Sequence, residues 1–133
     1  MDKNQIRITV RDETGTAWSV MEARKAARAI GFDENICQMI ATAVSELANN
    51  IVKYAGHGEI LMDRIIAGSR TGMEVIARDR GPGIEDIQKA MADHFSSGGT
   101  LGLGLPGVKR MMDEFELTSD PGKRTTVTIR KWL

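Results

Sequence analysis

The sequence predicts an α/β protein of the two-layer α+β sandwich type, with helices on one face of a mixed, mostly antiparallel sheet. Short apolar runs that alternate with polar residues predict strands, and two longer segments with apolar residues at helical spacing predict helices. The elements follow the order strand, helix, helix, strand, strand, helix, helix, strand, strand. With 133 residues, the chain can bury one core but not two, so we expect a single domain over residues 1–133.

Glycine, proline and capping residues place the boundaries of these elements. Turn and cap residues at 12–16 precede the first helix, Gly31 ends it, and Asp33 can cap the second. Val20, Met21, Ala27 and Ile30 are expected on the apolar face of the first helix, and 68–72 is expected to be a turn. The predicted elements are a strand at 6–10, helices at 18–30 and 33–54, strands at 60–66 and 73–78, helices at 85–93 and 106–114, and strands near 115–117 and at 125–132.

Composition excludes several classes of partner and location. Eighteen basic residues balance eighteen acidic ones, so the chain has no net charge that would attract nucleic acid or an anionic membrane surface. No run approaches the roughly 20 apolar residues of a membrane span, and the N-terminus lacks an apolar signal segment, so we expect a cytoplasmic protein. The single cysteine, Cys37, has no partner for an internal disulfide and is expected to pack in the core.

The second helix carries a Glu and an Asn one turn apart, Glu46 and Asn50. At about 100° per residue, both fall beside the apolar stripe, on the same side as Lys53, whereas Asn49 falls nearly opposite the stripe. Such a pair can hold a hydrated metal ion and a reacting hydroxyl. The alternative is that both are ordinary residues at the edge of the core.

An acidic residue ends the strand predicted at 73–78. Asp79 is followed by Arg80 and a Gly-Pro-Gly turn that contains Gly81 and Gly83. A carboxylate there can accept a hydrogen bond from the exocyclic amino group of a purine, and bare glycines let a flat ring approach the main chain. The alternative is a plain loop, because Pro and Gly are common turn residues.

A second glycine cluster, residues 96–105, runs into the helix predicted at 106–114. Free N–H groups and the helix dipole make such a junction an anion site. The cluster lacks the Gly-Lys-Ser/Thr ending of a Walker motif and does not follow a strand as a dinucleotide fingerprint does. By itself it is equally consistent with a plain flexible loop.

Taken in order, these segments resemble the GHKL ATPase/kinase superfamily, which has the Bergerat fold. The resemblance is carried by Glu46-Leu-Ala-Asn49-Asn50, then Asp79-Arg-Gly81-Pro-Gly83, then Gly102-Leu-Gly104-Leu, then Thr125-Thr126-Val127. It covers nearly the whole chain. Within the superfamily, the chain is most similar to the anti-sigma-factor kinases, and among them to the serine/threonine switch kinases of the stressosome.

The resemblance implies ATP and Mg²⁺ as cofactors and gives roles to residues of the second helix. Glu46 would be the general base for a serine or threonine hydroxyl, and Asn50 would bind the magnesium ion. Lys53 could reach a phosphate or could simply be solvated.

The same resemblance implies a nucleotide pocket. Asp79 would bind the adenine amino group, Gly81 and Gly83 would lie near the ring, and Thr125 would support the pocket. The residues implied to cradle the phosphates through backbone N–H groups are Gly102, Leu103 and Gly104.

Two features depart from the family pattern. Arg124 stands where the family usually has Gly before the pocket threonine, and the lid at 94–101 is very short, which predicts weak retention of nucleotide. The only histidines, His57 and His94, fall in predicted loops, which argues against an autonomous histidine kinase.

As a function, the resemblance implies an ATP-dependent serine/threonine protein kinase that phosphorylates STAS-domain antagonist or scaffold proteins in a bacterial stress-signalling partner switch. One alternative is a nucleotide-modulated binding module that sequesters or activates a regulator such as a PP2C-type phosphatase. Another is a detached ATPase fragment of a larger machine. A partner protein could dock on exposed charged residues of the first helix and of the helix predicted at 106–114. The alternative is that these residues are simply solvated. They are Arg24, Arg28, Lys109 and Arg110.

Overall fold

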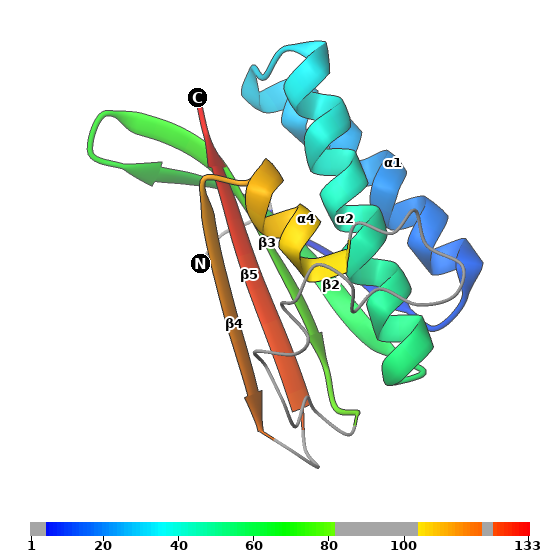
Figure 1. Cartoon of the computed structure of the whole chain (residues 1–133). Coiled ribbons are helices and arrows are strands. Elements are labelled where there is room, and N and C mark those ends of the chain that lie inside the picture. The colour runs from blue at the N-terminus through cyan, green and yellow to red at the C-terminus, as the bar shows by residue number, and fades with distance from the viewer. Residues whose placement is uncertain (1–4, 82–103, 121–123) are drawn as a thin grey trace.

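The computed structural model describes residues 5–81, 104–120 and 124–133 and contains a five-stranded sheet in the order β1-β2-β3-β5-β4. Each pair of neighbouring strands is antiparallel. The helices of the described residues pack on one face of the sheet (Figure 1), which confirms the predicted two-layer fold. The elements are β1 (Ile6–Val10), α1 (Glu13–Ile30), α2 (Glu34–Tyr54), β2 (Gly58–Ala67), β3 (Arg70–Asp79), α4 (Gly104–Met111), β4 (Glu114–Asp120) and β5 (Arg124–Trp132). The helix predicted at 85–93 lies outside the described residues.

Helix α1 begins earlier than the sequence predicts, because the Asp12 side chain caps it by accepting the N–H groups of Thr14 and Gly15 at 3.0 and 3.2 Å. Its end at Gly31, where φ is 120°, agrees with the prediction. The packed face was predicted in part: Ala27 is buried and Val20 and Ile30 are half-buried, but Met21 is 55% exposed.

The fully buried side chains of α1 are all small, namely Ser19, Ala23 and Ala27, the last of them as predicted. They let the helix approach its neighbours closely. At Gly15 an added Cβ would lie only 2.8 Å from the carbonyl oxygen of Thr9 in β1.

Helix α2 forms the centre of the core. Its apolar stripe is buried as predicted, with Ile40, Val44, Leu47 and Ile51 at most 3% exposed. Asn49, which was predicted to face solvent, is half-buried. A 21-residue helix with this stripe spans the sheet and brings its C-terminal half to the ends of β1 and β3.

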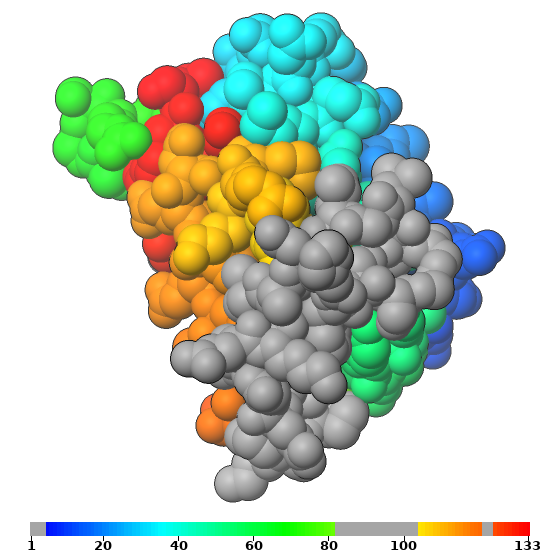
Figure 2. Space-filling model, in the orientation of Figure 1, coloured from blue at the N-terminus to red at the C-terminus, as the bar shows by residue number. Residues whose placement is uncertain are grey.

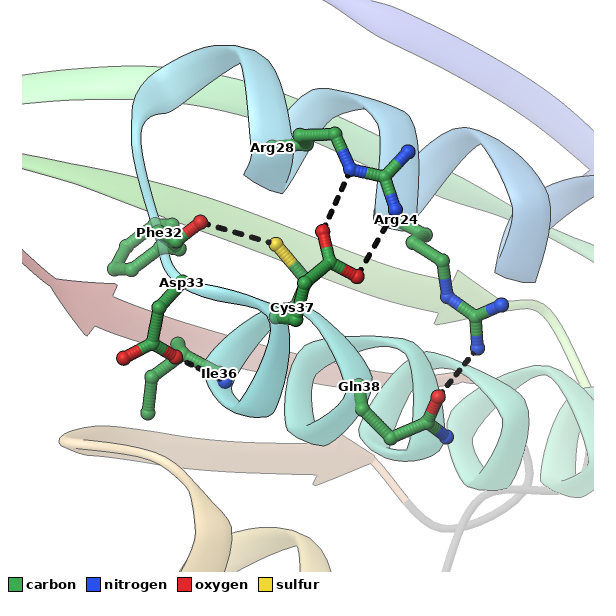
Figure 3. A network of polar contacts seen from close by, with 8 residues as sticks. Arg24, Arg28, Phe32, Asp33, Ile36, Cys37 and Gln38 are labelled. Atoms are coloured by element: carbon green, nitrogen blue, oxygen red, sulfur yellow. Dashed lines mark hydrogen bonds and ion pairs between the residues drawn. The ribbon is translucent and has the colours of Figure 1, made fainter.

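The corner between α1 and α2 is held by polar contacts (Figure 3). Arg28 binds Glu34 through two hydrogen bonds of 2.8 and 3.1 Å, and Arg24 donates to Gln38 at 2.6 Å. Arg24 and Arg28, two of the residues considered for docking, are therefore engaged with α2. Cys37 lies in the core, as predicted, with its thiol 3.4 Å from the carbonyl oxygen of Phe32.

Strands β2 and β3 form a long hairpin whose tip projects from the rest of the molecule (Figure 2). The turn is shorter than predicted: Ala67 pairs with Arg70, and Gly68 adopts a φ of 63°. Arg70 stacks on the Trp132 ring at 4.5 Å, and Gly72 leaves room for that ring, because a Cβ there would lie 2.7 Å from it.

Helix α4 begins and ends earlier than predicted, because Glu114 already belongs to β4. Val108 and Met112 are buried and Met111 is half-buried, so these three side chains pack α4 against the core. In the described parts of the chain, no helix has the length and apolar character needed to cross a membrane.

Candidate nucleotide and phosphoryl-transfer site

Glu46 is the one buried acidic side chain among the described residues, with 3% of its surface exposed. One carboxylate oxygen, Oε2, is buried without a hydrogen-bond partner in the described part of the chain. Burial raises the pKa of Glu46, and the backbone N–H of Gly104, which donates to the carboxylate, offsets part of this rise. A buried carboxylate with an unsatisfied oxygen is costly for folding and is typical of a functional group.

Asn50 and Lys53 follow Glu46 along α2 by one and two turns, so they lie on the same side of the helix. Asn50 is half-buried, as the helical wheel predicts for the edge of the core. Lys53 is exposed, and its ammonium lies 5.2 Å from the centre of the Tyr54 ring.

Asp79 is the last residue of β3 and is half-buried, which confirms its predicted place at a strand end. Its Oδ1 accepts the backbone N–H of Gly81 at 2.9 Å, which fixes the direction of the carboxylate. At Gly81 an added Cβ would lie 2.5 Å from the Cβ of Ala55, just after α2. Any larger residue at position 81 would clash with the residue that follows α2, so this position requires glycine.

A single row of paired residues crosses the sheet at this end. Gly58 pairs with Asp79, Asp79 with Thr125, and Thr125 with Ser119. At Gly58 an added Cβ would lie 2.5 Å from the carbonyl oxygen of Arg78 and 3.0 Å from the Asp79 Cβ. The hydroxyls of Ser119 and Thr125 are 3.0 Å apart.

Sequence reasoning missed Gly58 and Ser119 as members of this site. Their signal is the strand register, which a single sequence does not display. Arg124, whose presence departs from the family pattern, is an exposed residue at the start of β5, with its side chain 3.8 Å from Asp120. It leaves the pairing of Thr125 with Asp79 intact.

The first residue of α4, Gly104, has a φ of 57°, a conformation that favours glycine. Its N–H lies in the N-terminal turn of a helix, where anions are favoured, and it donates there to the Glu46 carboxylate. Gly83, Gly102 and Leu103, the remaining predicted cofactor-binding residues, lie outside the described residues.

Together these groups can recognise a nucleotide. The end of β3 supplies a fixed acceptor, the start of α4 supplies an N–H donor, and Glu46 supplies a buried acid or base that contacts this donor. The described residues contain no group of three or more His, Cys, Asp or Glu side chains that could hold a metal. A metal here would therefore need ligands of other kinds, such as Asn50, water and phosphate oxygens.

The family follows from a comparison with known domains. Residues 12–131 match the model of the histidine kinase-like ATPase domain, so the chain belongs to this family of ATPase and kinase domains. It is 47% identical over 122 residues to the serine/threonine-protein kinase RsbT of Bacillus subtilis (strain 168), covering 89% of this chain and 92% of that protein.

Anti-sigma factors are also relatives. The chain is 38% identical over 100 residues to the anti-sigma F factor of Thermoanaerobacter sp. (strain X514), covering 71% of this chain and 68% of that protein. The chain is therefore a homologue of serine/threonine kinases within a family of ATP-binding domains. This confirms the kinase class and the use of ATP that the sequence predicts.

Solved structures confirm the GHKL fold. The RsbU and RsbW domains of Rv1364c from Mycobacterium tuberculosis match with a TM-score of 0.62 at 19% identity, over 97% of this chain, which spans 32% of that longer chain. The SiaB-SiaC complex from Pseudomonas aeruginosa matches with a TM-score of 0.57 at 12% identity, over 98% of this chain and 90% of that one. At these identities, the likeness concerns the fold alone.

Proposed function

We propose that this protein acts in the cytoplasm as an ATP-dependent kinase that phosphorylates serine or threonine on STAS-domain partners of the RsbS and RsbR kind. The partner switch would belong to bacterial stress signalling. The observation that carries the chemistry is the buried Glu46, with one unsatisfied carboxylate oxygen and a hydrogen bond to Gly104 at the start of α4. The 47% identity to the serine/threonine-protein kinase RsbT supports phosphoryl transfer to serine or threonine as the reaction.

Glu46 would accept the proton of the substrate hydroxyl as that oxygen attacks the γ-phosphate. A raised pKa suits this role, because a general base works best when its pKa approaches the working pH. Positioning and charge neutralisation would supply most of the remaining rate.

The phosphates would lie at the start of α4, bound by the backbone N–H groups of Gly102 and Leu103 and by that of Gly104, which would exchange its bond to Glu46 for one to a phosphate oxygen. Asn50 fits a magnesium ligand, because its amide is half-buried one turn from Glu46 and Mg²⁺ keeps several waters and few protein ligands. When bound, the ion would neutralise charge on the phosphates. Lys53 could assist from the exposed end of the same side of α2.

The adenine ring would lie against the end of β3, beside Gly81 and Gly83. Asp79 keeps acceptor capacity for the amino group after it has bound Gly81, because a carboxylate has about four lone-pair sites. Thr125, directly paired with Asp79, would complete this side of the pocket.

The test is transfer of labelled γ-phosphate from ATP and Mg²⁺ to a STAS-domain protein. Wild type, Glu46→Gln, Asn50→Ala and Asp79→Asn are compared, with Glu34→Gln as the control, since Glu34 is an exposed residue of the same helix. We expect label on serine or threonine with wild type and with Glu34→Gln, and its loss in the other three.

The same samples separate a kinase from a binding module. Glu46→Gln should still form the complex with the partner, because it keeps the shape of the side chain. If no variant, wild type included, transfers phosphate although all bind the partner, the kinase proposal is wrong. The protein would then act by sequestering or activating a regulator, such as a PP2C-type phosphatase.

A further inference from the structure

Strand β4 forms one edge of the sheet, beside β5 (Figure 1). No strand of the described residues pairs with its outer side. The strand has seven residues, contains no proline and has no residue with a positive φ. Its backbone is therefore regular enough for a further strand to pair with it.

The register of the sheet shows in which direction the backbone groups of β5 point. Leu133 donates its N–H to the carbonyl oxygen of Thr71, one step beyond the pair of Trp132 and Gly72. In an antiparallel pair, residues that exchange hydrogen bonds alternate with residues that do not. The odd-numbered residues of β5 therefore face β3, and the even-numbered ones face β4. The N–H of Trp132 agrees, because it donates to Asp113, just before β4.

The same alternation continues into β4. The even-numbered residues of β5 from 124 to 130 pair with even-numbered residues of β4. Phe115 and Leu117, which are odd-numbered, therefore direct their backbone groups away from the sheet. Among the described residues, neither has a backbone hydrogen-bond partner on that side. The N–H and carbonyl groups of both residues are thus available to a further strand.

The side chains of β4 define the chemistry of such a strand. Phe115 and Leu117 are half-buried and pack against the core on the helix-covered face. On the other face, Glu114 and Glu116 are exposed, and Arg130 binds Glu114 at 3.0 Å. Glu116 has no such partner among the described residues. A basic residue directly opposite Glu116 would form a favourable cross-strand pair.

A second copy of β4 does not fit this edge. If Leu117 of each copy paired with Phe115 of the other, Glu116 would face the same residue of its partner copy. If Leu117 paired with itself, Glu114 would face Asp120. Both registers place like charges opposite each other, which is destabilising. The edge therefore favours a different chain that carries basic residues.

We propose that β4 is a docking edge for an extended segment of another protein, in which basic and apolar residues alternate. The segment pairs antiparallel to β4, as neighbouring strands of this sheet do. Its basic side chains lie opposite Glu116 and its neighbours, and its apolar ones lie beside Phe115 and Leu117. The inference goes beyond the proposed function and does not depend on it, because none of these residues belongs to the proposed nucleotide site.

The probe is a fluorescent peptide with the sequence Thr-Lys-Val-Lys-Val-Lys-Thr, titrated with the full chain and followed by anisotropy. Two further peptides carry N-methyl groups, either on both valines or on the lysines. In the proposed register, the valine N–H groups bond to β4, because residues that exchange hydrogen bonds lie on the same face as Phe115 and Leu117. The lysine N–H groups point away from β4.

We expect methylation of the valines to weaken binding at least about tenfold, because it removes hydrogen bonds to the edge. The peptide with methylated lysines should bind like the parent peptide. In hydrogen exchange followed by NMR, the parent peptide should slow the exchange of the Phe115 and Leu117 amide protons.

The charge of the edge is tested with Glu116→Lys, an exposed position where folding should be unaffected. This variant should bind the parent peptide about three- to tenfold more weakly, since a favourable pair becomes a repulsive one. It should bind better to a peptide in which Glu replaces each Lys. Glu13→Lys is the matched control, because Glu13 is an exposed acid in α1, and it should leave both affinities unchanged.

Equal binding of the two methylated peptides would show attraction by charge without strand pairing and would overturn the inference. Binding that leaves the exchange of the Phe115 and Leu117 amides unchanged would place the peptide elsewhere and would also overturn it. So would the absence of any binding of the parent peptide at millimolar concentration. Each of these results would leave the proposed kinase function untouched, since phosphoryl transfer is measured separately.

Discussion

The carboxylate of Glu46 accepts a hydrogen bond from the backbone N–H of Gly104, which joins the middle of α2 to the first residue of α4. The proposed base thus contacts the helix N-terminus at which phosphates are expected to bind. Because the same carboxylate has an unsatisfied buried oxygen, its charge should affect folding as well as catalysis.

Replacing Glu46 by Gln should raise stability most at high pH. The pKa of Glu46 is raised in the folded state, so the favourable contribution of its protonated form is complete below the unfolded value near 4.5. It is lost as pH rises through the folded pKa. Each unit of pKa shift corresponds to about 1.4 kcal/mol. Melting temperatures of wild type and variant, measured from acid to mildly alkaline pH, should diverge as pH rises.

Glu34→Gln is the control for this pH series. Its hydrogen bonds with Arg28 lower the pKa of Glu34, so its stabilising contribution is present above the unfolded pKa and is lost as pH falls through the folded one. The two variants should therefore differ from wild type with opposite slopes. A difference between Glu46→Gln and wild type that stays constant with pH would contradict the burial argument.

Gly58→Ala and Gly72→Ala should destabilise the fold similarly but differ in nucleotide binding. The added Cβ would lie 2.5 Å from the Arg78 carbonyl oxygen at Gly58 and 2.6 Å from the Lys131 carbonyl oxygen at Gly72. We expect each change to cost about 1–3 kcal/mol in thermal or urea unfolding. Only Gly58 faces Asp79, so only its replacement should also weaken ATP binding in calorimetry; equal loss in both variants would argue against the proposed pocket.

Asp79→Asn should weaken ATP binding by about 10- to 100-fold, the effect of losing a hydrogen bond to a charged acceptor. The substitution places an amide donor where the adenine amino group is expected. Asp120→Asn is the control, because Asp120 is exposed at the same end of the sheet. Calorimetric titration with ATP should separate the two, and an unchanged affinity in Asp79→Asn would remove Asp79 from the site.

Cys37 should not react with thiol reagents in the native protein. Its side chain is fully buried, and burial raises the pKa of the thiol, which leaves little of the reactive thiolate. In an absorbance assay with an aromatic disulfide reagent, the reaction should occur only after addition of denaturant. Labelling of the native protein at the rate of a free thiol would contradict the packing role.

The fold could be predicted from the sequence because each long element has a clear apolar period. The stripe of α2 and the alternation before Asp79 fixed the two elements that carry most of the proposed site. The exposure of Met21 was not predicted, because the size of an apolar side chain is a poor guide to its burial where a helix packs closely on its neighbours. There, Ser19 and Ala23 fit the gap, and Met21 does not.

The row from Gly58 to Ser119 could not be predicted from local patterns. It depends on which residues of four strands face each other, and these residues are far apart in the sequence. The hydrogen bond between Glu46 and Gly104 is of the same kind, since it joins two helices whose relative position is set by the packed core.

The role of Glu46 as the base is tested most directly by the mass of a STAS-domain partner after incubation with ATP, Mg²⁺ and either wild type or Glu46→Gln. We expect one added phosphoryl group on a serine or threonine with wild type, and an unmodified partner with Glu46→Gln in an intact complex. Equal phosphorylation by both proteins would contradict the role of Glu46 as the base.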